Sequence, residues 1–259
     1  MATVTALQPG AMLSTGDALR LEGVSRNFGA LKAVEDFSFS VAAGERRAVI
    51  GANGAGKTTL FNVITGDYAA SAGRVRFFGE DVTEHLPHER IRAGMRRTYQ
   101  SSLLFRDLTV RDNLFLAVRG VSRGRFSFLR SRKAPSVEDI LERVRLALVG
   151  DEPVAALSHG QQRQLEIGMA LAGAPRLILF DEPAAGLSPA ERRELVALLA
   201  ALPRHISYIL IEHDLEIALR VVDRVTVMHN GRMLKEGTPA EIENDPEVQE
   251  IYMGQAGHA

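Results

Sequence analysis

The sequence reads Gly51-Ala-Asn-Gly-Ala-Gly56-Lys57-Thr58 directly after a short apolar run, Ala48–Ile50, and this stretch decides the fold. It fits the pattern G-x-x-x-x-G-K-[ST], in which glycines let backbone N–H groups converge on a triphosphate. The apolar run predicts a strand that is covered on both faces. A helix pattern over 57–65 follows, and its positive end would point at the phosphates. Strand, glycine turn and helix together predict a phosphate-binding loop, which we call the phosphate loop (residues 51–58).

Two carboxylates end a second apolar run, Leu177–Phe180, as Asp181 and Glu182. Such residues lie at the carboxyl edge of a parallel sheet, where ligands bind. A plain turn is the alternative, because Pro183 follows. Together with the phosphate loop, the pair favours a site in which Asp181 holds Mg²⁺ and Glu182 orients and deprotonates a water molecule.

Strand and helix patterns alternate along most of the chain, which predicts an α/β core. Further strands are expected at Leu19, over 37–41 and over 207–211, and a hairpin turn at Asn230-Gly231. Ser188-Pro-Ala-Glu191 and Thr238-Pro-Ala-Glu241 each predict a helix start with a capping box. Residues 109–172 are mostly helical in pattern, so a helical insertion interrupts the core.

The composition excludes several classes of protein. The 259 residues are 46% hydrophobic and include no cysteine, so disulfides and thiolate sites are excluded. Apolar runs stay shorter than the roughly 18–20 residues that cross a bilayer. Residues 1–17 lack Lys and Arg, so we expect a flexible tail and no signal peptide. Residues 85–133 carry 12 basic and 3 acidic side chains, and this basic block should face something anionic or stay solvated.

The segment Leu157-Ser-His-Gly-Gln161, which we call the signature segment, resembles the signature of ABC ATPases. Gln100, at the end of Arg97-Thr-Tyr-Gln, looks like the family's Q-loop glutamine. His213 looks like its switch histidine, and Phe28 looks like the aromatic residue on which adenine stacks. The resemblance covers about 19–253. His159 replaces the second glycine that is usual in the signature, and Ser188 stands where many relatives carry Asp or Asn.

This resemblance implies an α/β P-loop NTPase fold: an ABC cassette with a RecA-like core, an antiparallel β subdomain and a helical insertion. Residues 18–259 would form one ATPase domain. Within it, 18–100 and 174–259 make the core with the β subdomain, and about 101–173 make the helical subdomain.

The resemblance also implies ATP and Mg²⁺ as cofactors and assigns residues to roles. Catalysis would use Glu182, His213, Lys57 and Gln100. The metal would be held by Thr58, Gln100 and Asp181. The nucleotide would bind Phe28, Asn53, Gly54, Ala55, Gly56, Lys57, Thr58 and Thr59, together with Ser158, Gly160 and Gln161 of the opposite subunit.

Several segments look most like the ATP-binding subunits of branched-chain (hydrophobic) amino-acid importers, notably 97–105, 181–189 and 236–254. That branch implies a homodimer or a heterodimer with a paralogous ATPase, two permease subunits and, indirectly, a substrate-binding protein. The expected location is the cytoplasmic face of the inner (plasma) membrane, as a peripheral subunit. The basic segment 119–133 would then lie at the membrane-facing edge, or it is a solvated loop.

Other functions also fit parts of the sequence. Urea, short-amide and lipopolysaccharide transporters use close relatives. A nucleic-acid-linked ABC ATPase would suit the basic block, but such proteins usually carry two cassettes or a long coiled-coil insertion, so no nucleic acid is expected. A kinase would have no use for the signature segment, and a GTPase would need an Asn-Lys-x-Asp segment, which is absent from the sequence.

Overall fold

The computed structural model describes residues 16–98, 104–121 and 135–256. For residues 121 and 252–256 only the backbone is described. Gln100, the tail up to residue 15 and most of the segment 119–133 lie outside the described residues.

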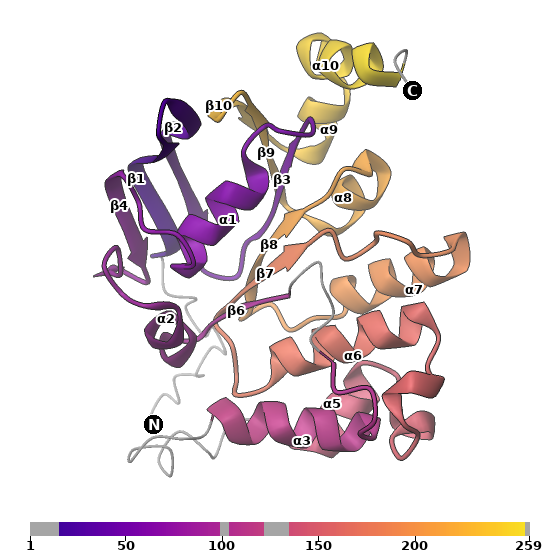
Figure 1. Ribbon diagram of the computed structural model, residues 1–259. Coiled ribbons are helices and arrows are strands. Elements are labelled where there is room, and N and C mark those ends of the chain that lie inside the picture. Colours follow the sequence, from indigo (N-terminus) through magenta and orange to yellow (C-terminus); the bar gives the residue numbers. More distant parts are fainter. Residues whose placement is uncertain (1–15, 99–103, 122–134, 257–259) are drawn as a thin grey trace, which may run out of the picture.

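Two sheets form the centre of the molecule (Figure 1). A four-stranded antiparallel sheet has the order β2-β1-β4-β5. A six-stranded sheet has the order β10-β9-β3-β8-β7-β6 and is parallel except for the pair β9–β10. The strands of the first sheet are β1 (Asp17–Phe28), β2 (Leu31–Ala42), β4 (Ala72–Phe77) and β5 (Glu80–Asp81). Those of the second are β3 (Arg46–Gly51), β6 (Met95–Arg97), β7 (Leu177–Asp181), β8 (Ser207–Ile211), β9 (Arg224–His229) and β10 (Arg232–Gly237).

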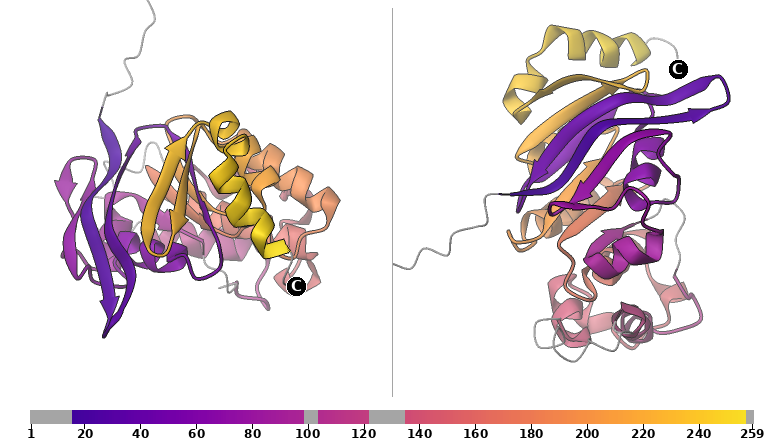
Figure 2. Two further views of the ribbon diagram at one scale, coloured as in Figure 1. Left: turned by 90° about the horizontal axis from the view of Figure 1, so that it is seen from above. Right: turned by 90° about the vertical axis from the view of Figure 1, so that its left-hand side faces the viewer.

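Helices cover the six-stranded sheet and form one end of the molecule (Figures 1 and 2). The helices are α1 (Lys57–Thr65), α2 (Pro87–Ala93), α3 (Val110–Val121), α5 (Val137–Arg143), α6 (His159–Leu171), α7 (Pro189–Ala200), α8 (Leu215–Val221), α9 (Pro239–Glu243) and α10 (Pro246–Ala256), with short 3₁₀ turns η2 (Ala147–Val149) and η3 (Val154–Ala156). None of those in the described part of the chain is long and apolar enough to cross a bilayer.

The six-stranded sheet is buried on both faces because its side chains alternate between two hydrophobic clusters. In β3, Ala48 and Ile50 join one cluster with the helical part, whereas Val49 joins the other with α1 and the antiparallel sheet. Strands β7 and β8 divide in the same way. A strand covered on both faces reads as a continuous apolar run, which is why these three strands could be predicted from the sequence.

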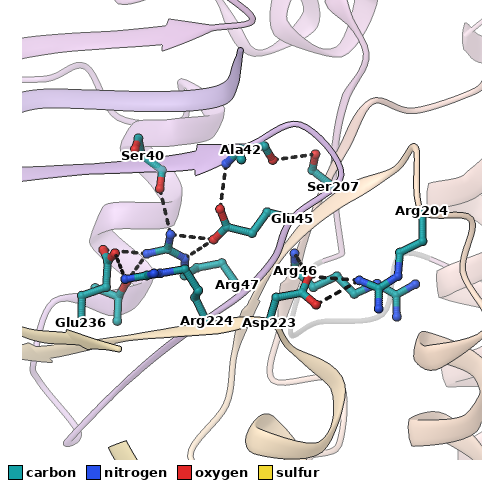
Figure 3. A network of polar contacts seen from close by, with 11 residues as sticks. Ser40, Ala42, Glu45, Arg46, Arg47, Arg204, Ser207, Asp223, Arg224 and Glu236 are labelled. Atoms are coloured by element: carbon teal, nitrogen blue, oxygen red, sulfur yellow. Dashed lines mark hydrogen bonds and ion pairs between the residues drawn. The ribbon is translucent and has the colours of Figure 1, made fainter. Parts of the chain in front are cut away.

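Arg47 on β3 links the two sheets in the polar network of Figure 3. Its guanidinium group is 2% exposed and lies 2.6 Å from Glu45 and 2.7 Å from Glu236. It also donates to the Thr226 side chain at 3.0 Å and to the Ser40 carbonyl on β2 at 2.9 Å. A buried cation requires such compensation. The network therefore joins β2 to β3, β9 and β10.

The structure confirms the α/β layout with an antiparallel sheet beside the parallel one. The phosphate loop runs from β3 into α1, and the acid pair stands at the end of β7, as predicted. Ser188 and Thr238 both cap helices through capping boxes, which confirms those two predictions. The Asn230-Gly231 turn joins β9 to β10. Sequence reasoning did not predict β4, whose first three residues are exposed, or β5 and β6, which are two and three residues long.

Candidate active site

Glycines in the phosphate loop stand where the backbone leaves no room for a side chain. Gly56 has φ 101°, and a Cβ there would lie 2.3 Å from the Ala33 carbonyl oxygen. A Cβ on Gly51 would lie 2.3 Å from the Met228 carbonyl oxygen. Only glycine fits such positions without strain. The loop is thus held between β2 and the end of β9, with its backbone at the start of α1.

Lys57 is buried, with its ammonium group folded back onto the loop. Its Nζ donates to the carbonyls of Gly51 at 2.6 Å and Ala52 at 3.0 Å. Burial lowers the pKa of Lys57, while the charges of Glu182 and Asp181 oppose that shift. The ammonium group therefore lies between the loop and the acid pair, where a phosphate would meet a positive charge.

A cavity of about 470 Å³ opens over the phosphate loop. Phe28 lies at its edge and is 40% exposed, with its ring edge-on to Tyr68 at a centroid distance of 5.4 Å. Arg26 lies over the same Phe28 ring at 4.6 Å. The lining residues are Phe28, Leu31, Lys32, Ala33, Asn53, Gly54, Ala55, Gly56, Lys57, Thr58, Thr59, Glu182, Asn230 and Gly231. The cavity thus joins an exposed aromatic face to a loop of backbone N–H groups and to one carboxylate.

Asp181 ends β7 with its carboxylate almost fully buried. Oδ2 accepts from Nη2 of Arg97 on β6 at 2.7 Å, and the Asp181 N–H donates to the Thr98 hydroxyl at 3.3 Å. Oδ1 is buried and accepts no hydrogen bond from any of the described residues. An unsatisfied buried carboxylate oxygen suits a water molecule or a hard cation such as Mg²⁺.

No cluster of three or more His, Cys, Asp or Glu side chains that could hold a metal occurs in the described ranges. A metal at Asp181 would therefore take further oxygen ligands from phosphate, water, the Thr58 hydroxyl or Gln100, which lies outside the described residues. Mg²⁺ ordinarily binds nucleotides in this way, through few protein ligands.

Glu182 adopts a left-handed backbone conformation with φ 48°. This conformation costs a residue with a side chain about 1–3 kcal/mol, and residues that adopt it cluster at functional sites. The Glu182 N–H donates to the Ile211 carbonyl of β8 at 3.0 Å, which helps to hold that conformation. His213 Nδ1 lies 3.9 Å from Glu182 Oε2. Glu182 thus turns toward the phosphate loop with His213 beside it.

Glu212 directly precedes His213 in the chain and is completely buried. Its Oε1 accepts from the Ala184 N–H at 2.8 Å, whereas Oε2 has no partner among the residues that the structure describes. Burial raises the pKa of Glu212, although the Ala184 hydrogen bond acts in the opposite direction. Sequence reasoning missed this residue, because nothing in Ile211-Glu-His-Asp214 marks the glutamate as buried.

The signature segment leads into α6 through a capping box. The Gln161 N–H donates to Ser158 Oγ at 3.2 Å, and Gln161 Oε1 accepts from the Ser158 N–H at 2.9 Å. Oε1 of Glu191, on α7, accepts from the Gly160 N–H at 2.9 Å. Among the residues that the structure describes, Ser158, Gly160 and Gln161 do not line the cavity over the phosphate loop.

The predicted site residues therefore fall into two groups. Phe28, the phosphate-loop residues, Thr59 and Glu182 share the cavity, with Asp181 and His213 beside it. The signature residues stand apart at the start of α6. Sequence reasoning missed the contributions of Leu31, Lys32 and Ala33 and of the Asn230-Gly231 turn, which had been noticed only as a hairpin signal. Its Gly231 N–H donates to the Ala55 carbonyl at 3.0 Å.

Comparison with known protein families covers most of the chain. Residues 34–185, which include the phosphate loop, the signature segment and the acid pair, match the family described as ABC transporter. The chain belongs to the ABC transporter family. As an ABC cassette it is a nucleotide-binding ATPase, and residues 236–258 of the cassette match a second family, described as branched-chain amino acid ATP-binding cassette transporter.

Named relatives resemble the cassette over nearly its full length. The high-affinity branched-chain amino acid transport ATP-binding protein LivG of Salmonella typhimurium is 39% identical over 92% of this chain and 98% of its own. BraF of Pseudomonas aeruginosa, with the same description, is 35% identical over the same shares. The crystal structure of the ADP conformation of MJ1267, an ATP-binding cassette of an ABC transporter, is 36% identical and superposes with a TM-score of 0.81. That superposition covers 93% of this cassette and 100% of the MJ1267 chain.

Proposed function

We propose that this protein is the ATP-hydrolysing subunit of an importer for branched-chain or other hydrophobic amino acids. The observation that carries the proposal is the match of residues 236–258 to the branched-chain family, because this segment lies outside the phosphate loop and signature segment common to ABC cassettes. The descriptions of LivG and BraF support the same assignment.

The phosphate loop would bind the triphosphate through the backbone of Asn53 to Gly56 and through Lys57, Thr58 and Thr59. Lys57 would leave the carbonyls of Gly51 and Ala52 and pair with phosphate oxygens, and this pairing would oppose the lowering of its pKa by burial. Phe28, which lines the same cavity, would stack on adenine. Base stacking on an aromatic face contributes about 1–3 kcal/mol.

Thr58, Gln100 and Asp181 would hold Mg²⁺, and this assignment is supported by Oδ1 of Asp181, which has no hydrogen-bond partner in the described part of the chain. When bound, the ion would neutralise charge that develops on the phosphate oxygens. Arg97 would keep the other oxygen of Asp181 in place through its 2.7 Å contact.

Glu182 would orient and deprotonate the attacking water, and His213 would hold the γ-phosphate and the water in line. Their 3.9 Å separation, and the position of Glu182 on the cavity wall, support these roles. The signature residues Ser158, Gly160 and Gln161 would serve the nucleotide of a second subunit. Two ATP molecules would then bridge a head-to-tail dimer, and hydrolysis would open it.

The partners would be a second copy or a paralogous ATPase, two permease subunits and, indirectly, a substrate-binding protein, at the cytoplasmic face of the plasma membrane. To test this, the complex is purified from membranes with its permeases and reconstituted with the binding protein. We expect leucine-loaded binding protein to stimulate ATP hydrolysis. Stimulation by a urea- or amide-loaded protein alone would contradict amino-acid import.

Glu182→Gln tests the hydrolytic mechanism. We expect ATP binding to be retained, turnover to fall by about 10²–10⁴-fold, and an ATP-bound dimer to accumulate, because only the base is removed. Glu216→Gln is the matched control, since the Glu216 side chain is 74% exposed on α8. Steady-state phosphate release and light scattering provide the two measurements, and normal turnover in Glu182→Gln would exclude it as the base.

A further inference from the structure

Glu191 bridges the starts of two helices with one carboxylate. Its Oε2 accepts from the N–H and the hydroxyl of Ser188, at 2.9 and 2.8 Å, and so caps its own helix α7. Its Oε1 accepts from the Gly160 N–H at 2.9 Å and from Ser158 Oγ at 3.4 Å, at the start of α6. A capping box accounts for the first pair of contacts and not for the second.

The contact with α6 is close and carries a full negative charge. A Cβ added to Gly160 would lie 2.5 Å from Glu191 Oε1, so the carboxylate rests directly on the first turn of α6. The Ser188 backbone hydrogen bond is the main cause that lowers the pKa of Glu191, and the Gly160 N–H contributes further. Glu191 is therefore an anion at neutral pH, seated where the helix end attracts negative charge.

We propose that Glu191 is a positioning residue of the signature segment: in the free subunit its carboxylate occupies the donors of Ser158 and Gly160, and the phosphate of the partner's ATP must displace it. This inference rests on the proposed function, which assigns those same two donors to that phosphate. One N–H and one hydroxyl hydrogen cannot serve both anions at full strength. The carboxylate and a phosphate at the same helix end would also repel each other.

This exchange has a structural consequence, because Glu191 follows the segment Ala184–Ser188 that leads from Glu182 into α7. Release of Oε1 leaves the Ser188 cap intact through Oε2. The start of α7 then loses the Glu191 hydrogen bonds to the first turn of α6 only when nucleotide arrives from the other subunit. Binding of the partner's ATP at the signature segment would thus change the contacts of the segment that runs from Glu182 to the start of α7.

The chain contains a matched control for this residue. Thr238-Pro-Ala-Glu241 repeats the Ser188-Pro-Ala-Glu191 motif, and Glu241 Oε2 accepts from the Thr238 N–H and hydroxyl at 2.7 and 2.9 Å. Glu241 caps α9, away from the signature segment. Glutamine can replace glutamate in a capping box, so Glu191→Gln and Glu241→Gln should both fold.

The experiment measures ATP-driven association in a Glu182→Gln background, with light scattering against ATP concentration. We expect Glu191→Gln to reach half-maximal association at about tenfold lower ATP, because the substitution removes the charge and leaves one accepting oxygen where Glu191 uses two, for the Ser188 cap and the Gly160 N–H. Glu241→Gln should leave the curve unchanged. Thermal melts of both variants check that neither is unfolded.

The outcomes separate the two proposals. Suppose that ATP drives the background variant to dimerise, but that Glu191→Gln needs as much ATP as the background or more. This result would overturn the inference and leave the proposed function standing. An equal shift in both glutamine variants would also overturn it, since capping alone would then explain the effect. The background variant could also form no ATP-driven dimer, either with itself or with an ATPase recovered from its membrane complex. That result would contradict the proposed function itself.

Discussion

Replacement of Arg47 by methionine tests whether the network between the sheets stabilises the fold. Methionine keeps much of the volume but removes a cation that lies 2.6 Å from Glu45 and 2.7 Å from Glu236. Loss of one partner of a buried pair costs about 3–5 kcal/mol. The Glu45 and Glu236 side chains are 13% and 27% exposed and can regain some hydration. We therefore expect a loss near the lower end, about 3 kcal/mol.

At this chain length such a loss lowers the melting temperature by roughly 6–12 °C, since each kcal/mol corresponds to about 2–4 °C. Calorimetry or thermal circular dichroism measures the difference. Arg224→Met is the control, because Arg224 contacts the same Glu236 at 2.8 Å but is 44% exposed. An exposed pair contributes less than about 1 kcal/mol. Equal destabilisation by the two substitutions would refute the structural role assigned to Arg47.

Three further predictions concern the site. Lys57→Ala should weaken ATP binding or slow turnover by at least about 10²-fold, measured by nucleotide titration and phosphate release, while an unchanged affinity would argue against phosphate binding here. Gly56→Ala should destabilise the fold more than Gly79→Ala, because both have positive φ but only the Gly56 Cβ would meet backbone, 2.3 Å from the Ala33 oxygen; equal melting temperatures would contradict this. Glu212 has a raised pKa, so above the unfolded value of 4.5 the folded protein retains a proton that the unfolded chain releases, and this contribution to stability falls as pH rises. Glu212→Gln removes that fall, so the variant should gain stability relative to the parent between pH 5 and pH 8. Denaturant titrations measure the free energy of unfolding of both proteins. If the difference between them stayed constant with pH, Glu212 would not titrate in this way.

Periodicity and local motifs predicted the parts of the fold that depend on neighbours in sequence. The buried runs in β3, β7 and β8, the capping boxes at Ser188 and Thr238, and the Asn230-Gly231 turn are all of this kind. Strand pairing was not predictable in the same way. An apolar run shows that a strand is buried but not which strand lies beside it, so the order β9-β3-β8 had to come from the structure.

The same distinction applies to the site. The residues proposed for nucleotide and metal stand in short motifs, and most of the described ones share the cavity or its edge. Arg97, Glu191 and Glu212 carry no sequence signal for their contacts with Asp181, Gly160 and Ala184. Each of these contacts joins segments at least 28 residues apart. Burial and tertiary geometry create them, and neither follows from local pattern.

The pairing of β3 places a constraint on how the protein is made. Both neighbours of this strand, β8 and β9, belong to residues 207–229. During synthesis β3, which is apolar, therefore stays without its partner strands until most of the polypeptide has emerged from the ribosome. Long-range pairing of this kind forms slowly and exposes the nascent chain to aggregation. A message truncated before codon 224 would encode every residue of the phosphate loop, the signature segment and the acid pair, yet leave β3 without one of its flanking strands.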